Sequence, residues 1–224
     1  MNHCDYCAQF ISPSGTVLDV GSGRGKFICE MAKRGFQATG IEINREYINE
    51  SQAKVDSENV EVSVIQASVE QLPFNDGQFD FVNCAEVIEH VEDPAKVCQE
   101  IYRVLKTNAK SYISFHNRWG ICDYHYHLYF INWLPRSWAE FILKLLKKQK
   151  EDSITGRQRL TTMHYYTYSQ ATYLLKKIGF LIKDIRVEKI KRKYGKLSLF
   201  FLLLYRLLRP FYFNTFHLLV EKYE

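Results

Sequence analysis

The sequence predicts an α/β fold built on one mostly parallel sheet with helices on both faces. Two observations carry this prediction. The apolar run 17–20 breaks into alternating glycines at Gly21, Gly23 and Gly25, and a helix-like segment follows. Strand-like and helix-like segments then alternate along the first half of the chain, which is typical of a parallel sheet. In such sheets a ligand binds at the carboxyl ends of the strands, where these glycines lie.

Each segment of the alternation has its own signal. Gly35 ends the first helix, Gly179 ends a later one, and Pro94 suits a first helical turn. Valines alternate with polar residues in 60–67, as in a half-buried strand. The predicted strands are 16–20, 37–41, 60–67, 79–84, 110–115, 180–187 and 213–221. The predicted helices are 25–34, 45–55, 94–105 and 167–178.

Residues 117–165 interrupt the alternation. A connection of this length inside a compact domain is usually functional, so we expect an insertion that acts as a lid or a binding surface. Its aromatic part is followed by the basic stretch 144–150. Half of its aromatic side chains are expected to pack under the sheet instead. These aromatics are Trp119, Tyr124, Tyr126, Tyr129, Phe130, Trp133, Trp138 and Phe141.

Length and composition indicate a single domain over residues 1–224. With 46% hydrophobic residues, the chain can bury a sizeable core. We divide it into a ligand-binding core at 10–118, the insertion at 117–165 and a C-terminal part at 166–224 that completes the sheet. The amphipathic segment 197–213 holds an apolar run that is too short to cross a bilayer, so no transmembrane segment is predicted.

The charge is divided unevenly along the chain. Residues 1–110 carry a net charge of −7 and residues 111–224 a net charge of +12, with 24 of the 33 aromatic residues in the second part. This asymmetry predicts an anionic partner for the second part, which the composition leaves open between a lipid surface, a phosphorylated small molecule and RNA.

The six cysteines are scattered, and no signal-peptide pattern opens the chain, so a reduced cytoplasmic setting is expected. Cys4 and Cys7 have the spacing of a metal or redox pair. Because no second pair stands at zinc-site spacing, we favour an ordinary helix there.

Acids mark the first two strands. Asp19 is a carboxyl group inside an apolar strand and needs a hydrogen-bonding or positive partner. Glu42 follows the second strand, where an acid can accept hydrogen bonds from both ribose hydroxyls of a nucleoside. The glycine turn and the acid together also fit dinucleotide-binding enzymes, so other motifs are needed to identify the ligand.

Five motifs in order supply that decision: Asp-x-Gly-x-Gly-x-Gly, Gly-x-Glu, and the segments 69–74, 79–82 and 102–106. With them, residues 10–118 resemble class I S-adenosylmethionine-dependent methyltransferases, of the methyltransferase type 11 group. The resemblance implies a Rossmann-like, seven-stranded, mostly parallel sheet with an antiparallel strand at its edge. It also implies S-adenosylmethionine as the cofactor.

Carried over by motif, the cofactor contacts would be made at the ends of the first four strands. Ser68 and Val69 stand where the family often has Asp-Ala, whose acid binds the adenine amino group. Serine offers no charge, so adenine recognition is expected to rest more on backbone groups. The implied contacts are Asp19, Gly21, Ser22, Gly23, Glu42, Ile43, Ser68, Val69 and Ala85.

The segment 86–90, directly after the fourth strand, bears on catalysis. On a helical turn Glu86, Glu89 and His90 share a face, and two carboxylates with an imidazole suit a divalent metal such as Mg²⁺. The pattern resembles that of ubiquinone-biosynthesis O-methyltransferases and small-RNA 2′-O-methyltransferases, which hold a metal with such residues and a later histidine. His164 is the candidate for that histidine.

Other methyltransferases of this class carry Glu-His here without a metal. The acid, Glu86, then caps the next helix or binds the cofactor's amino group, and the histidine is a base or simply packs. In that case His90 is our candidate general base. His116 ends the fifth strand and is either a substrate contact or a structural histidine, whereas His125 and His127 are expected on the surface or in a lid.

The sequence therefore predicts methyl transfer to an oxygen of a small or lipid-linked acceptor, with or without metal assistance. RNA methylation and a non-catalytic cofactor-binding scaffold are the alternatives. The insertion and 197–213 also predict a peripheral surface for an anionic membrane, where apolar side chains enter the interface beside basic ones. The basic residues are Lys144, Lys147, Lys148, Lys191, Arg192 and Lys193.

Overall fold

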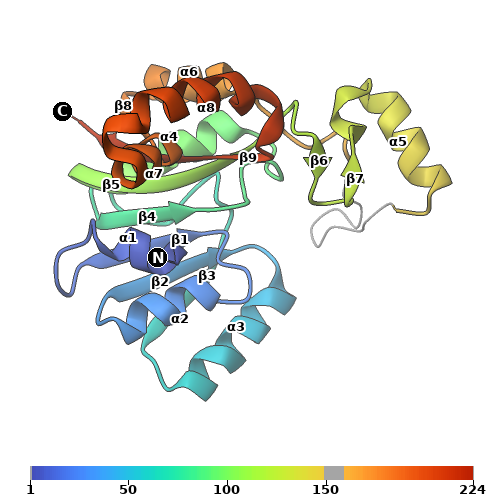
Figure 1. Cartoon of the computed structure of the whole chain (residues 1–224). Coiled ribbons are helices and arrows are strands. Elements are labelled where there is room, and N and C mark those ends of the chain that lie inside the picture. The colour runs from blue at the N-terminus through green and yellow to red at the C-terminus, as the bar shows by residue number, and fades with distance from the viewer. Residues whose placement is uncertain (1, 149–158, 224) are drawn as a thin grey trace.

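The computed structural model describes residues 2–148 and 159–223, and its centre is a seven-stranded sheet (Figure 1). The stretch 149–158, which includes the end of the predicted basic stretch 144–150, lies outside the described residues. The strand order is β3-β2-β1-β4-β5-β9-β8. The strands are β1 Thr16–Val20, β2 Gln37–Glu42, β3 Val62–Gln66, β4 Phe79–Cys84, β5 Leu105–His116, β8 Phe180–Asp184 and β9 Thr215–Lys222.

The fold class is as predicted, because five neighbouring strands run parallel and helices cover both faces. Residues of α4 and α6 join one core cluster, and residues of α1, α2, α3 and α7 join the cluster on the other side. The helices are α1 His3–Ala8, α2 Lys26–Lys33, α3 Arg45–Glu58, α4 Pro94–Val104, α5 Arg136–Leu145, α6 Tyr168–Ile178, α7 Ile185–Tyr194 and α8 Ser198–Tyr212. Cys4 and Cys7 lie in α1, the ordinary helix that we favoured.

Five of the helices, α1, α3, α4, α6 and α7, begin where a side chain accepts hydrogen bonds from the first backbone N–H groups. The Asn44 side chain accepts hydrogen bonds from two backbone N–H groups at the start of α3, and the Asp93 side chain does the same for α4, ahead of Pro94. Thr167 opens α6 with a capping box, and Gly179 ends that helix in the left-handed region. These local signals explain why most predicted boundaries lie close to the observed ones.

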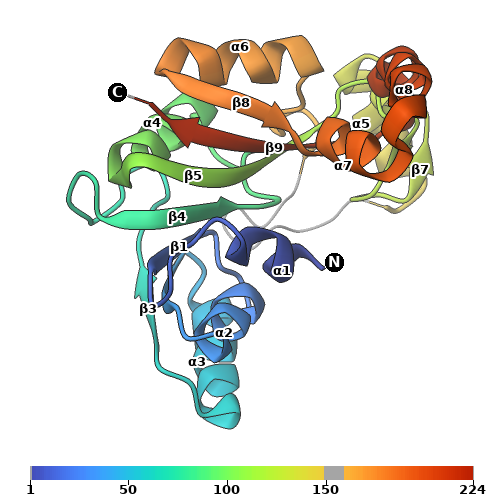
Figure 2. The same cartoon turned by 60° about the vertical axis from the view of Figure 1, so that its left-hand side comes forward.

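Two predictions about the end of the sheet are wrong. The antiparallel strand β9 does not lie at the edge, since it pairs with β5 on one side and β8 on the other. The predicted strand 180–187 stops at Asp184, because the carboxylate of Asp184 accepts hydrogen bonds from the N–H groups of Arg186 and Val187 and starts α7 there. Figure 2 shows α7 following β8 and leading toward α8.

The insertion packs around its own small core and stands beside the sheet rather than under it (Figure 1). It contains the two-stranded β6 Cys122–Asp123 and β7 Leu128–Tyr129, the short 3₁₀ helix η1 Ile131–Trp133, and α5. Of the eight aromatic residues singled out in the sequence, only Tyr126 is buried and the other seven are exposed. The expectation that half of them pack under the sheet is therefore wrong.

Gly25 shows why the glycine turn tolerates few substitutions. Its φ of +74° lies in the left-handed region, and a Cβ there would approach the hydroxyl oxygen of Ser51 in α3 to 2.2 Å. The turn can thus pack against α3 only without a side chain. Gly35 also has a positive φ, of +84°, but no atom lies within 4 Å of its hypothetical Cβ.

We expect Gly25→Ala to lower the free energy of unfolding by roughly 2–5 kcal/mol, the sum of left-handed strain and overpacking. Gly35→Ala is the matched control and should cost only about 1–2 kcal/mol, from strain alone. Urea unfolding of the cofactor-free protein measures both. If both variants lose the same free energy of unfolding, the close approach to Ser51 does not destabilise Gly25→Ala.

Candidate active site

The glycine turn closes tightly over the end of the sheet. Gly21 has a φ of +70°, and a Cβ there would meet a methyl group of Val87 at 2.5 Å. The backbone N–H of Ser22 donates to the carbonyl of Ile41 at 2.8 Å, which ties the turn to β2. The hydroxyl of Ser22 is buried and has no hydrogen-bond partner in the described structure. The turn thus presents a bare backbone edge to a ligand.

Glu42 fastens the turn to the end of β2. One carboxylate oxygen accepts a hydrogen bond from the N–H of Gly23 at 2.9 Å. The other accepts from the N–H groups of Ile43 and Asn44, each at 2.9 Å. A carboxylate held in this way keeps its orientation and has lone pairs left for the hydroxyls of a ribose. This geometry fits the predicted nucleoside contact.

Asp19 has the hydrogen-bonding partner that its burial requires. Asn83 in β4 donates to its carboxyl group at 2.6 Å, and the Asn83 side-chain oxygen lies 2.9 Å from Nε2 of His3 in α1. Burial raises the pKa of Asp19 to about 7, Asn83 opposes that rise, and the charge of Glu42 adds to it. Sequence reasoning missed Asn83 and His3, although Asn83 was visible as a polar residue in an apolar strand.

The other predicted cofactor residues follow β2, β3 and β4 along the same edge of the sheet. Ile43 is exposed, as is Ser68, whose hydroxyl accepts a hydrogen bond from the N–H of Glu70 at 3.2 Å. Val69 and Ala85 are partly buried against the two core clusters. Their contacts with a cofactor stay predictions.

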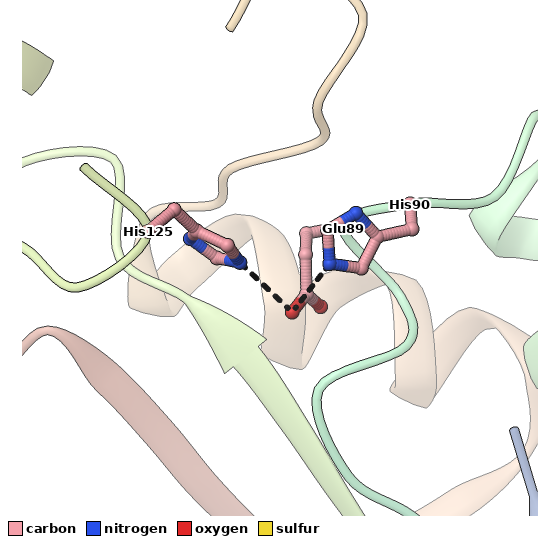
Figure 3. A group of neighbouring side chains, drawn as sticks. All are labelled: Glu89, His90 and His125. Atoms are coloured by element: carbon pink, nitrogen blue, oxygen red, sulfur yellow. Dashed lines mark ion pairs between the residues drawn. The ribbon is translucent and has the colours of Figure 1, made fainter. Parts of the chain in front are cut away.

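The segment 86–90 forms turns, not the helical turn that we expected, and Glu86 has a φ of +58°. Glu86, Glu89 and His90 therefore do not share one face. Instead, their ligand atoms fall into two overlapping groups that each bring in a histidine from elsewhere. One group is Glu86, Glu89 and His116, the other is Glu89, His90 and His125, and in each the atoms lie within 4.8 Å of one another. Figure 3 shows the second group.

Glu86 and His116 form a close ion pair beside Ser114. Nε2 of His116 lies 2.7 Å from Oε2 of Glu86, and the Ser114 hydroxyl donates to Oε1 at 3.1 Å. Partial burial alone would raise the pKa of Glu86, but the hydrogen bond and charge of His116 lower it to about 2. Burial would lower the pKa of His116, yet Glu86 and Glu89 together raise it to about 10. At neutral pH His116 is therefore a cation and not a free base.

Glu89 is the centre of the cluster. Its side chain is fully buried, and neither carboxylate oxygen has a well-aligned hydrogen bond in the described structure. Three imidazole nitrogens surround Oε1 instead. That of His116 lies at 3.0 Å. Those of His90 and His125, drawn in Figure 3, lie at 3.6 Å and 3.8 Å. A buried carboxylate needs positive charge nearby. This arrangement can hold either a proton on an imidazole or a metal cation.

His125 was expected on the surface or in a lid, and of these two places the structure excludes the surface. Its side chain is only 15% exposed, and its ring lies 4.5 Å from that of His116, centroid to centroid. Nδ1 lies 3.2 Å from the hydroxyl of Tyr165, which donates to Asp123 at 2.7 Å. Burial and then the charge of His116 lower the pKa of His125 to about 4, so its imidazole is neutral at pH 7. His127 is exposed, as predicted.

His164, the predicted later ligand, reaches the cluster through its backbone. Its N–H donates to the carbonyl oxygen of Glu89 at 3.0 Å. Its imidazole belongs to neither group of ligand atoms found among residues 2–148 and 159–223. The structure thus brings the imidazoles of His116 and His125, and not that of His164, beside Glu89. A residue distant in sequence, such as His125, offers no spacing signal by which it could have been chosen.

Comparisons with known proteins agree with this geometry. A family model described as "Methyltransferase domain" matches residues 18–113. The ubiquinone biosynthesis O-methyltransferase of Alkalilimnicola ehrlichii is 33% identical over 66% of this chain and 58% of its own length. That of Psychrobacter cryohalolentis is 29% identical over 72% of this chain and 67% of its own length. The chain thus spans somewhat more than half of the first relative.

Solved structures show the same fold. The crystal structure of an S-adenosylmethionine-dependent methyltransferase from Methanosarcina mazei superposes with a TM-score of 0.64 at 20% identity, covering 100% of this chain and 98% of that chain. One from Aquifex aeolicus gives 0.59 at 16% identity, covering 97% and 88%.

The cofactor of that family, S-adenosylmethionine, fits what β1 and β2 present. The turn offers bare backbone, Glu42 holds a fixed carboxylate at the end of β2, and Asp19 is a buried acid close enough to feel its charge. Residues 18–113 match the methyltransferase domain, and in motifs, sheet topology and relatives the chain is similar to S-adenosylmethionine-dependent methyltransferases.

Proposed function

We propose that the protein transfers a methyl group to an oxygen atom of a small or lipid-linked acceptor. The observation that carries this proposal is the cluster around Glu89, which brings carboxylates and imidazoles together beside the glycine turn. Val87, within the same segment 86–90, packs directly against Gly21. Oxygen methylation requires the loss of a hydroxyl proton, and groups of this kind can bind or receive that proton. The names of the curated relatives support oxygen as the acceptor atom.

S-Adenosylmethionine, when bound, supplies an activated methyl group on a sulfonium. The protein's own residues then have to hold the two reactants in line and deal with one proton. Glu42 would orient the ribose, and Asp19 with the backbone of Gly21 and Gly23 would hold the methionine part. Glu86 and His116 would orient the acceptor hydroxyl. Without a metal, His90, at the more exposed side of the cluster, is our candidate for the general base.

A divalent metal such as Mg²⁺ is part of this proposal. Glu89 is a buried carboxylate without an aligned hydrogen bond and lies among three imidazoles. The carboxylates Glu86 and Glu89 suit a hard ion such as Mg²⁺, and the imidazoles extend the donor set to divalent transition metals. Glu86, Glu89, His90, His116 and His125 would supply the ligands, in place of the predicted His164. Bound there, the metal would make an acceptor hydroxyl more acidic.

We also propose that the protein works at an anionic membrane surface, where a lipid-linked acceptor would be found. No helix in the described ranges is long and apolar enough to span a bilayer. However, the apolar stripe of α8 faces solvent, whereas the apolar stripe of a helix in a globular protein normally faces the core. The stripe consists of Leu199, Phe200, Leu203, Leu204, Leu207, Leu208, Phe211 and Tyr212.

Two neighbours extend this surface. The ring of Trp133 in the insertion lies 5.7 Å from that of Phe211, so the exposed aromatics of the insertion continue the stripe. The adjoining helix α7 ends in Lys191, Arg192 and Lys193. Apolar side chains beside cations match the interface of an anionic bilayer. RNA would match the cations but not the aliphatic stripe, which is why we favour the lipid.

Cofactor binding should release a proton near neutral pH. The pKa of Asp19 is about 7 in the free protein, and the cationic methionine part of the cofactor favours the ionised carboxylate. Calorimetry at pH 6.5 in buffers of different ionisation enthalpy should therefore detect proton release. The release should vanish at pH 8.5, where Asp19 is already ionised.

Asp19→Asn should abolish the proton release. Glu42→Gln should weaken cofactor binding, but the proton release should remain. Release that persists in Asp19→Asn would assign the proton to another group. If wild-type protein binds no S-adenosylmethionine at all, the scaffold alternative gains over the enzyme.

Metal binding can be tested without an acceptor. We expect Mn²⁺ to bind the wild-type protein, as followed by electron paramagnetic resonance, and chelator to lower methyl transfer. Glu89→Gln and His125→Ala should weaken Mn²⁺ binding by about tenfold or more. His164→Ala is the matched control and should bind normally. Absence of binding in wild-type protein, or equal losses in His125→Ala and His164→Ala, would argue against these ligands.

Vesicle cosedimentation tests the membrane proposal. Wild-type protein should bind vesicles that contain anionic lipid, and this binding should weaken at high salt. The double variant Leu203→Glu with Leu207→Glu should bind about tenfold or more weakly, because two charges would enter the interface. The matched control replaces two exposed tyrosines outside the stripe, Tyr173 and Tyr223, by Glu. Binding unchanged by the stripe variant, or binding only when RNA is present, would refute the proposal.

A further inference from the structure

A cavity of about 250 Å³ lies between α1, β5, β9 and α7. Its walls include His3, Tyr6, Tyr112, Arg186, Lys189 and His217. We infer that this cavity receives a negatively charged group, a carboxylate or a phosphate, carried on a ring of the acceptor. This inference rests on the proposed function and names the chemical class of its substrate.

The cavity borders both halves of the proposed active site. On one side, Nε2 of His3 lies 2.9 Å from Asn83, which donates to the buried Asp19. On the other side, His217 pairs across the sheet with Ser114, whose hydroxyl donates to Glu86. A molecule in the cavity would therefore lie between the acid at the methionine end of the cofactor and the acid of the cluster.

The cations of the cavity have aromatic neighbours rather than acidic partners. Arg186 and Lys189 are three residues apart on α7 and so lie on one side of it. The Arg186 guanidinium lies 4.1 Å from the centre of the Phe213 ring, and Nζ of Lys189 lies 5.8 Å from that of Tyr6. Within residues 2–148 and 159–223, neither cation has a carboxylate at ion-pair distance. Two such cations facing one cavity favour an oxyanion.

The neighbouring imidazoles respond to this positive charge. Burial, together with the charge of Arg186, lowers the pKa of His217 to about 4. Burial also lowers the pKa of His3, where Asn83 opposes the shift and Lys189 adds to it. Both imidazoles are therefore neutral at pH 7. The positive charge at the cavity therefore comes from Arg186 and Lys189 of α7.

The remaining walls suit a flat ring. Tyr112 packs edge-on against His3 with ring centroids 4.3 Å apart, and the Tyr112 hydroxyl is hydrogen-bonded to Nδ1 of His217. Tyr6 is buried beside them. The volume is below that of a pocket for drug-sized ligands and close to what one substituted ring requires. In an aromatic or other cyclic acid, the ring would pack against these side chains and the acid group would pair with Arg186 and Lys189.

Ring-sized probes test the inference on the full-length protein. Benzoate and phenyl phosphate carry the proposed groups, and benzyl alcohol is the neutral control. By calorimetry we expect both anions to bind wild-type protein at least tenfold more tightly than benzyl alcohol. Arg186→Gln with Lys189→Gln should lose tenfold or more of the anion affinity. Arg186→Lys with Lys189→Arg should keep most of it.

Lys191→Gln with Lys193→Gln is the matched control, because it removes the same charge from the same helix outside the cavity. It should bind the anions like wild type. Equal loss in this control, no selectivity for the anions, or no binding of any probe would overturn the inference.

S-Adenosylmethionine binding, measured on each variant, separates the two proposals. We expect the Arg186 and Lys189 variants to bind it like wild type. A loss of cofactor affinity in Arg186→Gln with Lys189→Gln would assign the cations to the cofactor's own carboxylate and overturn the inference. It would leave the proposed methyl transfer intact.

Discussion

The buried carboxylate of Glu89 is the constraint on which the candidate active site depends. A negative charge without exposure to water is costly unless a positive group lies beside it. The cationic His116 from β5 meets this requirement, and the imidazoles of His90, from the same segment, and His125, from the insertion, complete the surroundings of Oε1. The insertion thus contributes a side chain to the cluster as well as packing around its own small core.

The same constraint separates the roles of the histidines. His116 lies between two carboxylates and carries a proton, whereas His125 lies beside that cation and remains neutral. Chemically identical side chains a few ångströms apart therefore offer a donor and an acceptor at the same pH. Such a pairing suits a site that must orient a hydroxyl and also remove its proton.

Sequence reasoning could single out the predicted cofactor residues but not the residues of the proposed acceptor side. Asp19, Gly23 and Glu42 follow from local spacing at the ends of adjacent strands, and the structure brings them close together. His125 and Arg186 offer no such signal, because they come near the sheet only when the insertion and α7 fold back toward it. The strand end at Asp184 was missed because the carboxylate begins a helix where apolar residues still favoured a strand.

The position of β9 has a consequence for how the protein is made. Its residues are synthesised after those of β5 and β8, yet it lies between them and hydrogen-bonds to both. A growing chain therefore exposes the edge of β5 to solvent until residues 215–222 have left the ribosome. Open strand edges pair readily with other chains, and this pairing spans more than a hundred residues of sequence. The first five strands of the sheet are thus complete in the nascent chain while one edge is still open to pairing with other chains.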